Sequence, residues 1–457
     1  MNILSEIVAQ KRLEIAARRK AFPLEQFVKE LVPADRDFYK VLEDRKHAGV
    51  PAFILECKKA SPSQGLIRAD FDPAAIADVY KKYADVISVL CDEKFFQGDY
   101  KNLSIVRSRT SVPVLCKEFI IDEYQVYLAR HFGADAILLM LSVLDDETYL
   151  RLENLAHRLG MGVLTEADSH EDIERANALG ARVVGINNRN LRTLQTDIER
   201  SRELAGNVRK DAVCVAESGL HSHGDAKSLS AVADAFLVGT ALMRQENLDR
   251  ACRRLIFGEN KVCGLDNATS AQAALSTGTL FGGLIFAKKS PRLLTLPQAL
   301  EIKNAVPALD YVAVFKDNPE SEILDVAGTL KVFAVQLHGN ESDDFAHRLR
   351  ERLPVGTQIW RALDGNALTG VPVTDAGLYD RYILDGGSGG GKSFDWSKIP
   401  EKLKSLSMLA GGIGASNARD AHRVGCLGVE FNSAVESVPG KKSPEKIAAA
   451  FEQLRKF

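Results

Sequence analysis

The chain has 457 residues, of which 46% are apolar and 26% are charged, and its formal net charge is −2. This length exceeds one ordinary hydrophobic core, so we expect two domains of roughly 200–250 residues each. The near-neutral charge argues against nucleic-acid partners, and the lack of any run of about 18 apolar residues excludes a membrane-spanning helix. Seven scattered cysteines show no metal-ligand spacing, which predicts no metal site and favours a reducing, cytoplasmic location.

The N-terminal segment carries apolar residues at helical spacing over residues 3–13, with basic residues among and after them. Such a basic amphipathic helix suits either a membrane surface, a transit peptide or a helix packed on the first domain. The acidic residues Glu6 and Glu14 weaken the transit interpretation. We therefore expect an extra N-terminal helix that packs on the domain after it.

The first half of the chain alternates short apolar strands with longer amphipathic segments such as Pro73–Tyr83 and Asp145–Gly160. This alternation predicts parallel strands joined by helices. The predicted strands are Phe53–Glu56, Val86–Leu90, Val112–Lys117, Ala134–Met140, Gly162–Glu166, Val183–Asn187, Ala212–Glu217 and Ala235–Val238.

The pattern then restarts, which predicts a second domain of the same kind. We expect domains at 1–255 and 256–457, with the boundary in the charged stretch 253–260. The predicted strands of the second series are Lys261–Cys263, Leu280–Phe286, Tyr311–Phe315, Val332–Leu337, Gln358–Arg361, Arg381–Asp385, Ser407–Ala410 and Gly428–Asn432.

Polar residues stand at the ends of many strands in each half. An open doubly wound sheet gathers its site at one switch point, whereas a closed barrel brings the carboxyl ends of all its strands to one mouth. The sequence therefore predicts the α/β class with two fused (β/α)8 TIM barrels and the extra N-terminal helical segment. In the first half these strand-end residues are Glu56, Lys58, Lys117, Glu166, Asn187, Glu217 and Ser218.

Two lysines and two glutamates among these residues suggest acid–base chemistry. Glu56 and Lys58 are two residues apart at the end of a strand, so their side chains face the same side. Lys117 and Glu166 end two other strands. Burial and proximity would raise the pKa of a glutamate and lower that of a lysine, which would make them proton-transfer partners near neutral pH.

Two glycine-containing turns predict a phosphate site. Glu217-Ser218-Gly219 ends one strand, and Val238-Gly239-Thr240 ends the next. Glycine lets backbone N–H groups approach an anion, and a helix N-terminus adds partial positive charge. The loops after strands seven and eight are the usual phosphate site of a TIM barrel.

Residues 1–255 resemble indole-3-glycerol-phosphate synthase. The matching pieces are ECKKASPSQG from Glu56, LCKEFIID from Leu115, LTEA from Leu164, GINNRNL from Gly185, AESGL from Ala216 and LVGTAL from Leu237. The resemblance implies ring closure of 1-(2-carboxyphenylamino)-1-deoxyribulose 5-phosphate with loss of carbon dioxide and water. It implies no metal and no redox cofactor.

The same resemblance implies roles for individual residues. Lys117 would be the general acid at the substrate ketone, and Glu166 would shuttle protons during dehydration. Lys58 would lie near the substrate carboxylate or phosphate and share proton transfer, and which lysine donates which proton stays open. Glu56, Asn187 and Ser218 would orient these groups. The implied substrate-binding residues are Ser61, Arg189, Glu217, Gly219, Gly239 and Thr240.

In the second half, Cys263 and Asp385 each end a strand. Cys263 is interpreted either as a small buried residue or as a base opposite the carboxylic acid Asp385. A thiol has a pKa near 8.5, so modestly electropositive surroundings would activate it.

The stretch Gly386–Ser393 matches the nucleotide-binding pattern GxxxxGK[ST]. A P-loop must open a helix, yet Pro400 comes within two turns, so we reject that interpretation and expect a mobile lid with glycine hinges.

Residues 260–457 resemble phosphoribosylanthranilate isomerase. The matching pieces are KVCGL from Lys261, GGLIFAKKSPR from Gly282, VQLHG from Val335, LDGGSGGGKSFDW from Leu384, LAGGI from Leu409 and EFNSAVES from Glu430. The resemblance implies an Amadori rearrangement of N-(5-phosphoribosyl)anthranilate to the ketose that the first half uses.

In this resemblance Asp385 would protonate the ribose ring oxygen, and Cys263 would then remove the C2 proton. Arg292 would bind the anthranilate moiety, and His338 would either line the site or serve as a structural hydrogen-bonding residue. The phosphate would lie against Gly411, Gly412, Asn432 and Ser433. Glu430 stands where an aspartate is common in the family, which leaves its role open.

The two implied reactions are consecutive, because the product of the second half is the substrate of the first. We expect a monomeric bifunctional enzyme whose partners are small phosphorylated substrates, with two separate sites and an intermediate that passes through solvent. A shared tunnel is the weaker hypothesis. The alternatives are a pair of phosphosugar aldolases or isomerases with other substrates, and a catalytically dead phosphosugar sensor.

Overall fold

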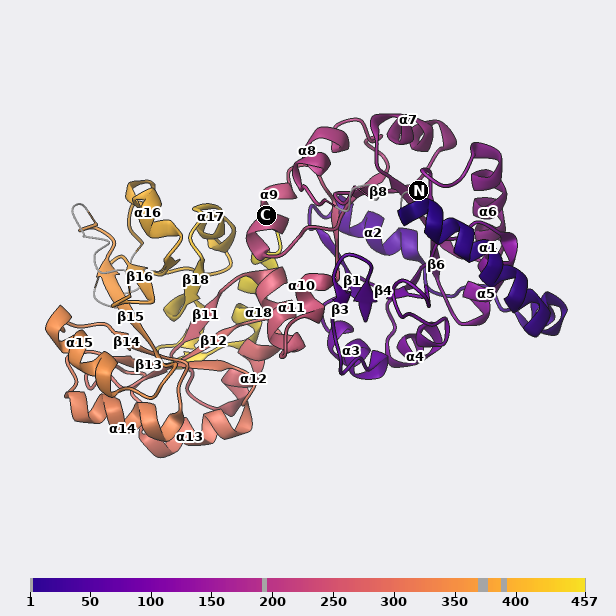
Figure 1. Ribbon diagram of the computed structural model, residues 1–457. Helices are drawn as coiled ribbons and strands as arrows, with labels where there is room; N and C mark the ends of the chain where they lie inside the picture. Colours follow the sequence, from indigo (N-terminus) through magenta and orange to yellow (C-terminus); the bar gives the residue numbers. More distant parts are fainter. Residues whose placement is uncertain (1–2, 191–194, 369–376, 388–392, 457) are drawn as a thin grey trace. The chain divides into compact units, whose positions relative to one another are not determined.

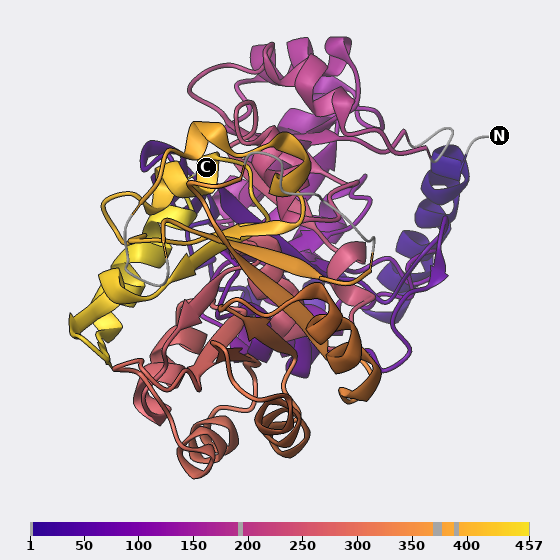
Figure 2. The same cartoon turned by 90° about the vertical axis from the view of Figure 1, so that its left-hand side faces the viewer.

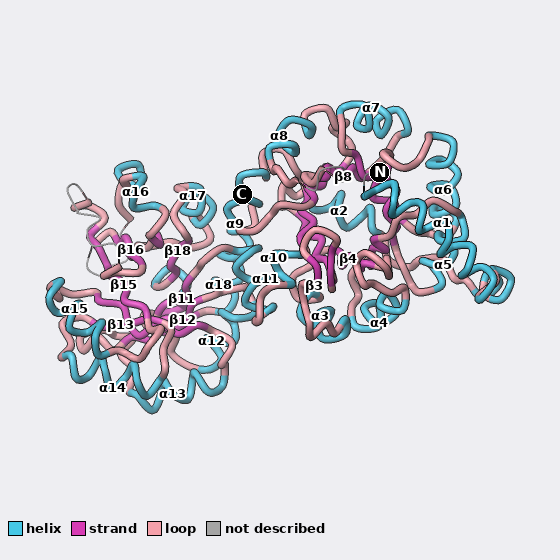
Figure 3. Tube along the Cα trace, in the orientation of Figure 1, coloured by secondary structure: helices cyan, strands magenta, loops and turns pink. Residues whose placement is uncertain are grey.

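The computed structural model describes residues 3–190, 195–368, 377–387 and 393–456. The chain divides into two compact units, residues 1–256 and 257–457. Each unit contains one closed barrel of eight parallel strands. Figure 3 shows the strands of each unit in magenta with the helices in cyan outside them. The prediction of two TIM barrels is confirmed.

The first barrel has the strand order β1-β10-β9-β8-β7-β6-β5-β4, closed by the pairing of β1 with β4. Figure 1 shows these strands inside the ring of helices. The strands are β1 Ala52–Cys57, β4 Val86–Leu90, β5 Val114–Lys117, β6 Ala136–Met140, β7 Gly162–Ala167, β8 Val183–Asn187, β9 Val213–Glu217 and β10 Ala235–Val238. A short hairpin, β2 Ala60–Ser61 and β3 Gly65–Leu66, comes after β1.

Several helices of the first unit begin at a residue whose side chain caps them. Asp72 accepts hydrogen bonds at the start of α3, and Ser169 and Gly180 bound α7. The helices are α1 Ile3–Ala21, α2 Phe38–His47, α3 Pro73–Tyr80, α4 Lys101–Arg109, α5 Glu123–His131, α6 Asp146–Arg158, α7 His170–Leu179, α8 Glu199–Ala205, α9 His223–Leu229, α10 Thr240–Met243 and α11 Leu248–Phe257.

The interior of the first barrel is apolar toward the amino ends of the strands and polar at their carboxyl ends. Successive side chains of a strand alternate between its two faces, so residues two apart point the same way. Ala52 and Ile54 pack in the interior with Leu164 and Val215, over Phe38 of α2. The next inward position on each of these strands carries a polar residue, which brings the polar residues together at one mouth.

The second barrel runs in sequence order from β11 to β18 and closes by the pairing of β11 with β18. In Figure 2 its strands lie at the centre of the unit with helices around them. The strands are β11 Lys261–Cys263, β12 Phe281–Ile285, β13 Asp310–Phe315, β14 Ala334–Leu337, β15 Gln358–Asp364, β16 Arg381–Asp385, β17 Ser407–Leu409 and β18 Gly428–Phe431. The helices are α12 Ala268–Ser276, α13 Leu296–Ala305, α14 Glu320–Leu330, α15 Asp343–Arg352, α16 Glu401–Lys404, α17 Ala418–Arg423 and α18 Pro444–Leu454. A hairpin of β19 Glu436–Val438 and β20 Lys441–Lys442 precedes α18.

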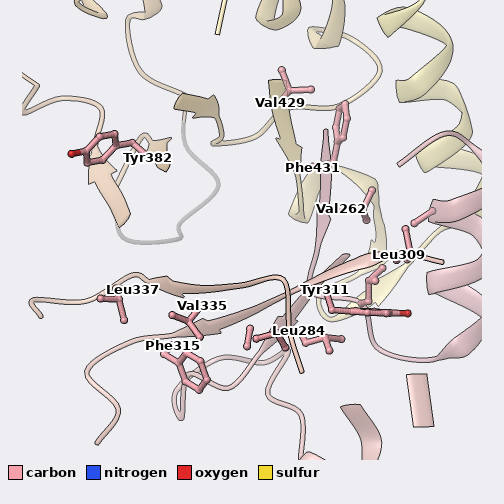
Figure 4. Packing of buried hydrophobic residues seen from close by; sticks show 14 of the residues in the cluster. Val262, Leu284, Leu309, Tyr311, Phe315, Val335, Leu337, Tyr382, Val429 and Phe431 are labelled. Atoms are coloured by element: carbon pink, nitrogen blue, oxygen red, sulfur yellow. The ribbon is translucent and has the colours of Figure 1, made fainter. Parts of the chain in front are cut away.

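Outward-facing strand residues of the second barrel form the main core with its helices. Figure 4 shows members of this layer, among them Leu284, Tyr311 and Val335. A separate inner cluster, which includes Phe281 and Trp360, fills the barrel interior. The barrel is thus a packed core rather than a pore, as is usual for this fold.

At the amino ends of the strands, both barrels repeat one hydrogen-bonding device. A residue immediately before a strand uses its side-chain oxygen to accept a hydrogen bond from a backbone N–H of the neighbouring strand, at 2.8–3.0 Å. All four aspartates among them also pair with a basic side chain: Asp85, Asp234 and Asp380 do so at 2.6–2.9 Å, and Asp135 pairs with Arg107. We call these residues the strand anchors: Asp85, Asp135 and Asp234 in the first barrel, Asn260 and Asp380 in the second.

Helix α1 packs on the first unit, the arrangement that the sequence favours. Its Lys11 is 3% exposed, and Nζ lies 2.8 Å from Asp92 and 3.0 Å from Glu118. Across the described residues, none of the helices combines the length and the apolar character needed to span a membrane.

Candidate active sites

A cavity of about 720 Å³ opens at the carboxyl ends of the first barrel's strands. It is the meeting point expected for strand-end residues of a closed barrel. The sequence-predicted residues that line it are Glu56, Lys58, Lys117, Glu166, Asn187, Arg189, Glu217, Ser218, Gly219, Gly239 and Thr240.

Lys117 is the centre of the charge network in this cavity. Its Nζ lies 3.2 Å from Glu166 Oε2 and 3.4 Å from Glu217 Oε2. Asn187 Nδ2 donates to Glu166 Oε1 at 3.1 Å, and this bond fixes the carboxylate that Lys117 contacts. A second pair forms beside it, because Lys58 Nζ lies 2.7 Å from Glu56 Oε1.

The pKa values of this network differ in part from the sequence-based expectation. Burial and the neighbouring carboxylates raise the pKa of Glu217 to about 8, although Lys117 opposes this. Burial also acts to lower the pKa of Lys117, but Glu166, Glu217 and Glu56 outweigh it and raise that pKa above its usual 10.5. The expected lowering of the lysine pKa is therefore wrong for Lys117, because three acidic neighbours stabilise its charged form.

Two glycines leave room for the carboxylates. A Cβ on Gly185 would lie 1.9 Å from Glu217 Oε1, and one on Gly239 would lie 2.4 Å from Glu56 Oε1. Both are far closer than an ordinary van der Waals contact, so these positions exclude every larger side chain unless the carboxylate moves.

The proposed phosphate corner lies beside these carboxylates. Ser218 and Gly219 have φ values of +64° and +80°, a conformation that glycine adopts readily and serine rarely. Asn188 Nδ2 donates to the Ser218 carbonyl at 3.1 Å and supports this turn. Thr240 begins α10 directly after Gly239, so its backbone N–H is one of those left without a partner inside the helix.

In the second barrel, three acceptors surround the ammonium group of Lys261. Its Nζ lies 2.6 Å from Gln336 Oε1, 2.8 Å from Glu430 Oε2 and 3.4 Å from Cys263 Sγ. Lys261 is 0% exposed and Cys263 is 2% exposed. An ammonium group has three N–H donors, so every one of them has an acceptor here.

Cys263 is buried, as one of the two interpretations of the sequence expects, and its thiol lacks the lowered pKa that the other interpretation requires. Burial and the Glu430 carboxylate raise the pKa of Cys263 to about 11, although Lys261 and Lys442 act in the opposite direction. The expected electropositive surroundings are present, but desolvation and one negative charge outweigh them.

The hydrogen-bond chain continues from Gln336 to the second strand-end acid. Gln336 Nε2 lies 3.2 Å from His338 Nδ1, and His338 Nε2 lies 3.6 Å from Asp385 Oδ2. His338 therefore contacts the Asp385 carboxylate in addition to its hydrogen bond with Gln336.

Arg292 is held by a residue that the sequence analysis missed. Its guanidinium makes two parallel hydrogen bonds to Glu436, at 2.7 and 2.8 Å. Glu436 also lies 2.7 Å from Lys442 Nζ, which donates to Asn432 Oδ1 at 2.9 Å. A Cβ on Gly264 would meet Arg292 Cδ at 2.7 Å, so this glycine lets the guanidinium side chain cross beside Cys263.

The glycines after β17 lie near the loop after β18. Gly411 and Gly412 have φ values of +94° and +67°, and Ser433 begins a short 3₁₀ turn after Asn432. A Cβ on Gly414 would lie 2.9 Å from Ala434 Cβ, so the loops that carry the predicted phosphate residues are in contact.

Two family models together match almost all of the chain. Residues 4–255 match indole-3-glycerol phosphate synthase, and residues 260–453 match N-(5'-phosphoribosyl)anthranilate (PRA) isomerase. Curated relatives described as "Tryptophan biosynthesis protein TrpCF" extend over both parts. The protein from Salmonella typhi is 49% identical over 458 residues, covering 100% of both chains. The Haemophilus influenzae protein is 49% identical over 464 residues, covering 99% of this chain and 97% of its own. The Yersinia pestis protein is 47% identical over 458 residues, covering 100% and 95%.

The chain belongs to the TrpCF family. Within it, the N-terminal unit is an indole-3-glycerol phosphate synthase domain and the C-terminal unit a PRA isomerase domain.

One predicted residue of the TrpCF synthase domain lies away from the cavity wall. Ser61 is buried in the β2–β3 hairpin, where it pairs with Gly65, and it is not among the residues that line the cavity. Ser63 lines the cavity instead and accepts a hydrogen bond from Arg189 Nη1 at 2.8 Å. The chain turns at this hairpin, and the signal for the turn in the sequence is Pro62 and Gly65, two residues typical of turns.

The apolar wall of this cavity was also missed. Phe96 and Phe119 come from the loops after β4 and β5, and Met140 and Leu237 lie at the carboxyl ends of β6 and β10. The signal available in the sequence was their position at or just beyond the carboxyl ends of predicted strands, but apolar residues there are equally typical of core packing.

The glycine-rich stretch of the TrpCF isomerase domain is only partly described. The predicted lid falls mainly on residues 388–392, outside the described residues. The described chain from Ser393 onward agrees with the rejection of a P-loop. A 3₁₀ turn spans Trp396–Lys398 and α16 begins after Pro400, so no helix opens at Ser393.

Proposed function

We propose that the two units catalyse consecutive steps. The C-terminal unit isomerises N-(5-phosphoribosyl)anthranilate to 1-(2-carboxyphenylamino)-1-deoxyribulose 5-phosphate. The N-terminal unit then closes the indole ring and releases carbon dioxide and water. Family membership over the full length of both domains supports this assignment.

In the isomerase unit, Asp385 acts as the general acid and Cys263 as the general base. Asp385 gives its proton to the ribose ring oxygen as the C1–O bond breaks, which leaves a Schiff base. Cys263 takes the C2 proton, and the resulting enolamine becomes the ketose when C1 gains a proton and the C2 hydroxyl loses one. Arg292 binds the anthranilate carboxylate, and the phosphate lies against the backbone at Gly411, Gly412, Asn432 and Ser433.

In the synthase unit, Lys117 is the general acid. The observation that carries this proposal is the position of its ammonium group between Glu166 and Glu217 at the head of the cavity. Its raised pKa keeps a proton available for the substrate ketone as the aromatic carbon attacks. Glu166 then moves protons during dehydration, and recovery of the aromatic ring drives decarboxylation.

The remaining synthase residues hold the substrate and the catalytic groups. Lys58 lies near the substrate carboxylate or phosphate, and Glu56 and Asn187 orient the two lysine–carboxylate pairs. The phosphate binds in the corner formed by Ser218, Gly219, Gly239 and Thr240, and Arg189 and Ser63 close that side of the cavity.

The test monitors both steps in one preparation. Wild-type protein is given phosphoribosylanthranilate while anthranilate-type fluorescence and indole-3-glycerol phosphate are measured. Cys263→Ala should stop the first step yet still cyclise added ketose. Lys117→Ala should accumulate the ketose. If wild type consumes nothing, the assignment fails, and a phosphosugar aldolase or a non-catalytic sensor becomes the better hypothesis.

We further propose that the intermediate passes through solvent, that the enzyme is a monomer and that it is cytoplasmic. Each proposed site draws its residues from a single unit, which supports two independent reactions. The thiols of Cys91 and Cys116 lie 3.5 Å apart without a disulfide, which suits a reducing compartment. Dilution of labelled intermediate into an added unlabelled pool tests the first point, and light scattering tests the second.

A further inference from the structure

The isomerase barrel holds a layer of buried polar groups directly beneath its proposed base. Lys261 and Cys263 are two residues apart on β11, so both side chains face the barrel interior. Glu430 lies on the neighbouring strand β18, directly opposite Lys261 in the strand register. The apolar cluster of Phe281 and Trp360 fills the interior below. A charged pair in such a place is costly, because replacing it with apolar groups is often neutral or stabilising.

The proposed base presents a chemical problem that this layer can solve. A general base must lose its own proton before it accepts one from the substrate, yet burial keeps the Cys263 thiol protonated at neutral pH. Besides Lys261, the basic groups Lys442 and Arg292 act on the thiol, and both pair with Glu436. Lys261 is in contact with the sulfur and with a carboxylate at the same time.

We propose that Lys261 is a positioning residue that relays the Cys263 thiol proton to Glu430. Lys261 Nζ first gives one of its three protons to Glu430 Oε2, and the freed lone pair of the nitrogen then takes the thiol proton, so the S–H bond breaks as a new N–H bond forms. The result is a thiolate, an unchanged ammonium group and a neutral carboxylic acid. The net charge of the buried group stays the same, so the transfer needs no counterion.

The proton count over one turnover also closes. The thiolate takes the C2 proton and becomes a thiol again, while Glu430 holds the proton that the thiol gave up. Asp385 has lost one proton to the ribose ring oxygen. Glu430 returns its proton to solvent as Asp385 regains one, so the cycle needs no co-reactant. This inference rests on the assignment of Cys263 as the base.

The relay also gives a role to Glu430, which stands where an aspartate is common in the family. Gln336 holds the third N–H of Lys261, at 2.6 Å, and so points the other two at sulfur and carboxylate. The glutamate at position 430 reaches the lysine at 2.8 Å. An aspartate would be one methylene shorter, so Glu430→Asp should retain the acceptor but weaken the contact.

The first experiment measures the proton affinity of the Cys263 thiol in the absence of catalytic turnover. Full-length protein is alkylated with iodoacetamide over a range of pH, and modification of Cys263 is quantified by mass spectrometry of its peptide. Lys261→Met should slow alkylation at pH 9 at least about tenfold, because the thiolate loses the ammonium group that contacts it. An unchanged pH profile would overturn the proposal.

The second experiment separates a relay from structural support. Lys261→Met alone leaves a buried carboxylate unpaired, so the double variant Lys261→Met/Glu430→Met is made as well. Both should fall at least about 10²-fold in isomerase kcat, the usual contribution of a proton-transfer group. Glu430→Asp should stay within about tenfold of wild type, since it keeps the proton acceptor. A double variant with wild-type kcat would refute the relay.

Two controls keep this result distinct from failure of the proposed function. Synthase activity of the same chains reports the folding of the first unit and the amount of active protein, and circular dichroism during thermal unfolding reports whether the isomerase barrel is folded in each variant. Cys263→Ala reports whether this cysteine is the base at all. If Cys263→Ala keeps isomerase activity, the function assignment is wrong; if it is inactive while the double variant is active, only the relay is wrong.

Discussion

Gly185→Ala should displace Glu217 and slow ring closure. The new Cβ would stand 1.9 Å from Glu217 Oε1 and 3.0 Å from its Cδ, with Leu164 Cδ1 at 3.2 Å on another side. To reach an ordinary contact of 3.4 Å, the carboxylate oxygen must retreat by about 1.5 Å. The ion pair with Lys117, now 3.4 Å long, would then be lost or redirected.

Misplacement of a catalytic group by about 1 Å can cost about 10²-fold in rate, so we expect a fall in synthase kcat of that order. Overpacking should also reduce the free energy of unfolding by about 1–3 kcal/mol. The assay measures indole-3-glycerol phosphate formed from added ketose, and isomerase activity of the same preparation serves as the internal control.

The matched control variant is Gly206→Ala. Gly206 has φ −61° and ψ −18°, an ordinary helical conformation, and a Cβ there would meet nothing within 4 Å. It should leave both activities unchanged and stabilise slightly, if at all. A folded Gly185→Ala protein that keeps synthase kcat within about threefold of wild type would refute the reasoning, because Glu217 would not depend on this space.

Three further predictions concern buried ion pairs. Lys11→Met leaves the carboxylates of Asp92 and Glu118 without their cationic partner. The free energy of unfolding, measured in urea, should therefore fall by about 3–5 kcal/mol. An unchanged unfolding midpoint would mean that α1 is held by apolar contacts alone. Arg292→Lys loses the paired hydrogen bonds to Glu436. The isomerase KM should therefore rise about 10- to 100-fold, while the synthase KM stays unchanged. An isomerase KM equal to that of wild type would argue against substrate contact by Arg292. Burial acts to raise the pKa of Glu436, but Arg292 and Lys442 outweigh it and lower that pKa to about 2, below its usual 4.5. Its stabilising contribution is therefore present above pH 4.5 and is lost as pH falls toward 2. Melting temperatures of wild type and Glu436→Gln should converge over that interval, and parallel curves would contradict this.

The fold could be predicted from the sequence because strand periodicity and strand-end polarity point the same way. β4, β8, β10 and β16 begin and end at the predicted residues. The largest difference is at β15, which continues to Asp364, three residues past the predicted end at Arg361. Ala362 and Leu363 are only partly buried and Asp364 is exposed, so no buried apolar run marks the end of this strand.

The site could be predicted less completely, for physical reasons. A residue at a strand end can be placed by periodicity alone, which is why Lys117 and Glu166 were found. Glu436 and Lys442 lie in a hairpin beyond the last barrel strand, and only the folded chain brings them to Arg292. The pKa of Cys263 likewise depends on how deeply the thiol is buried and on which charge faces it, and neither is visible in a one-dimensional pattern.

Because of the strand anchors, the amino-end and carboxyl-end residues of each barrel can change at different rates during evolution. At the amino ends, one side-chain oxygen holds two neighbouring strands together, so most substitutions there act on the whole barrel. At the carboxyl ends the chemistry is spread over loops that leave the anchors untouched. New substrate preferences could therefore accumulate at the mouth of either barrel while the frame beneath it stays the same, and one barrel could diverge without its covalent neighbour having to follow.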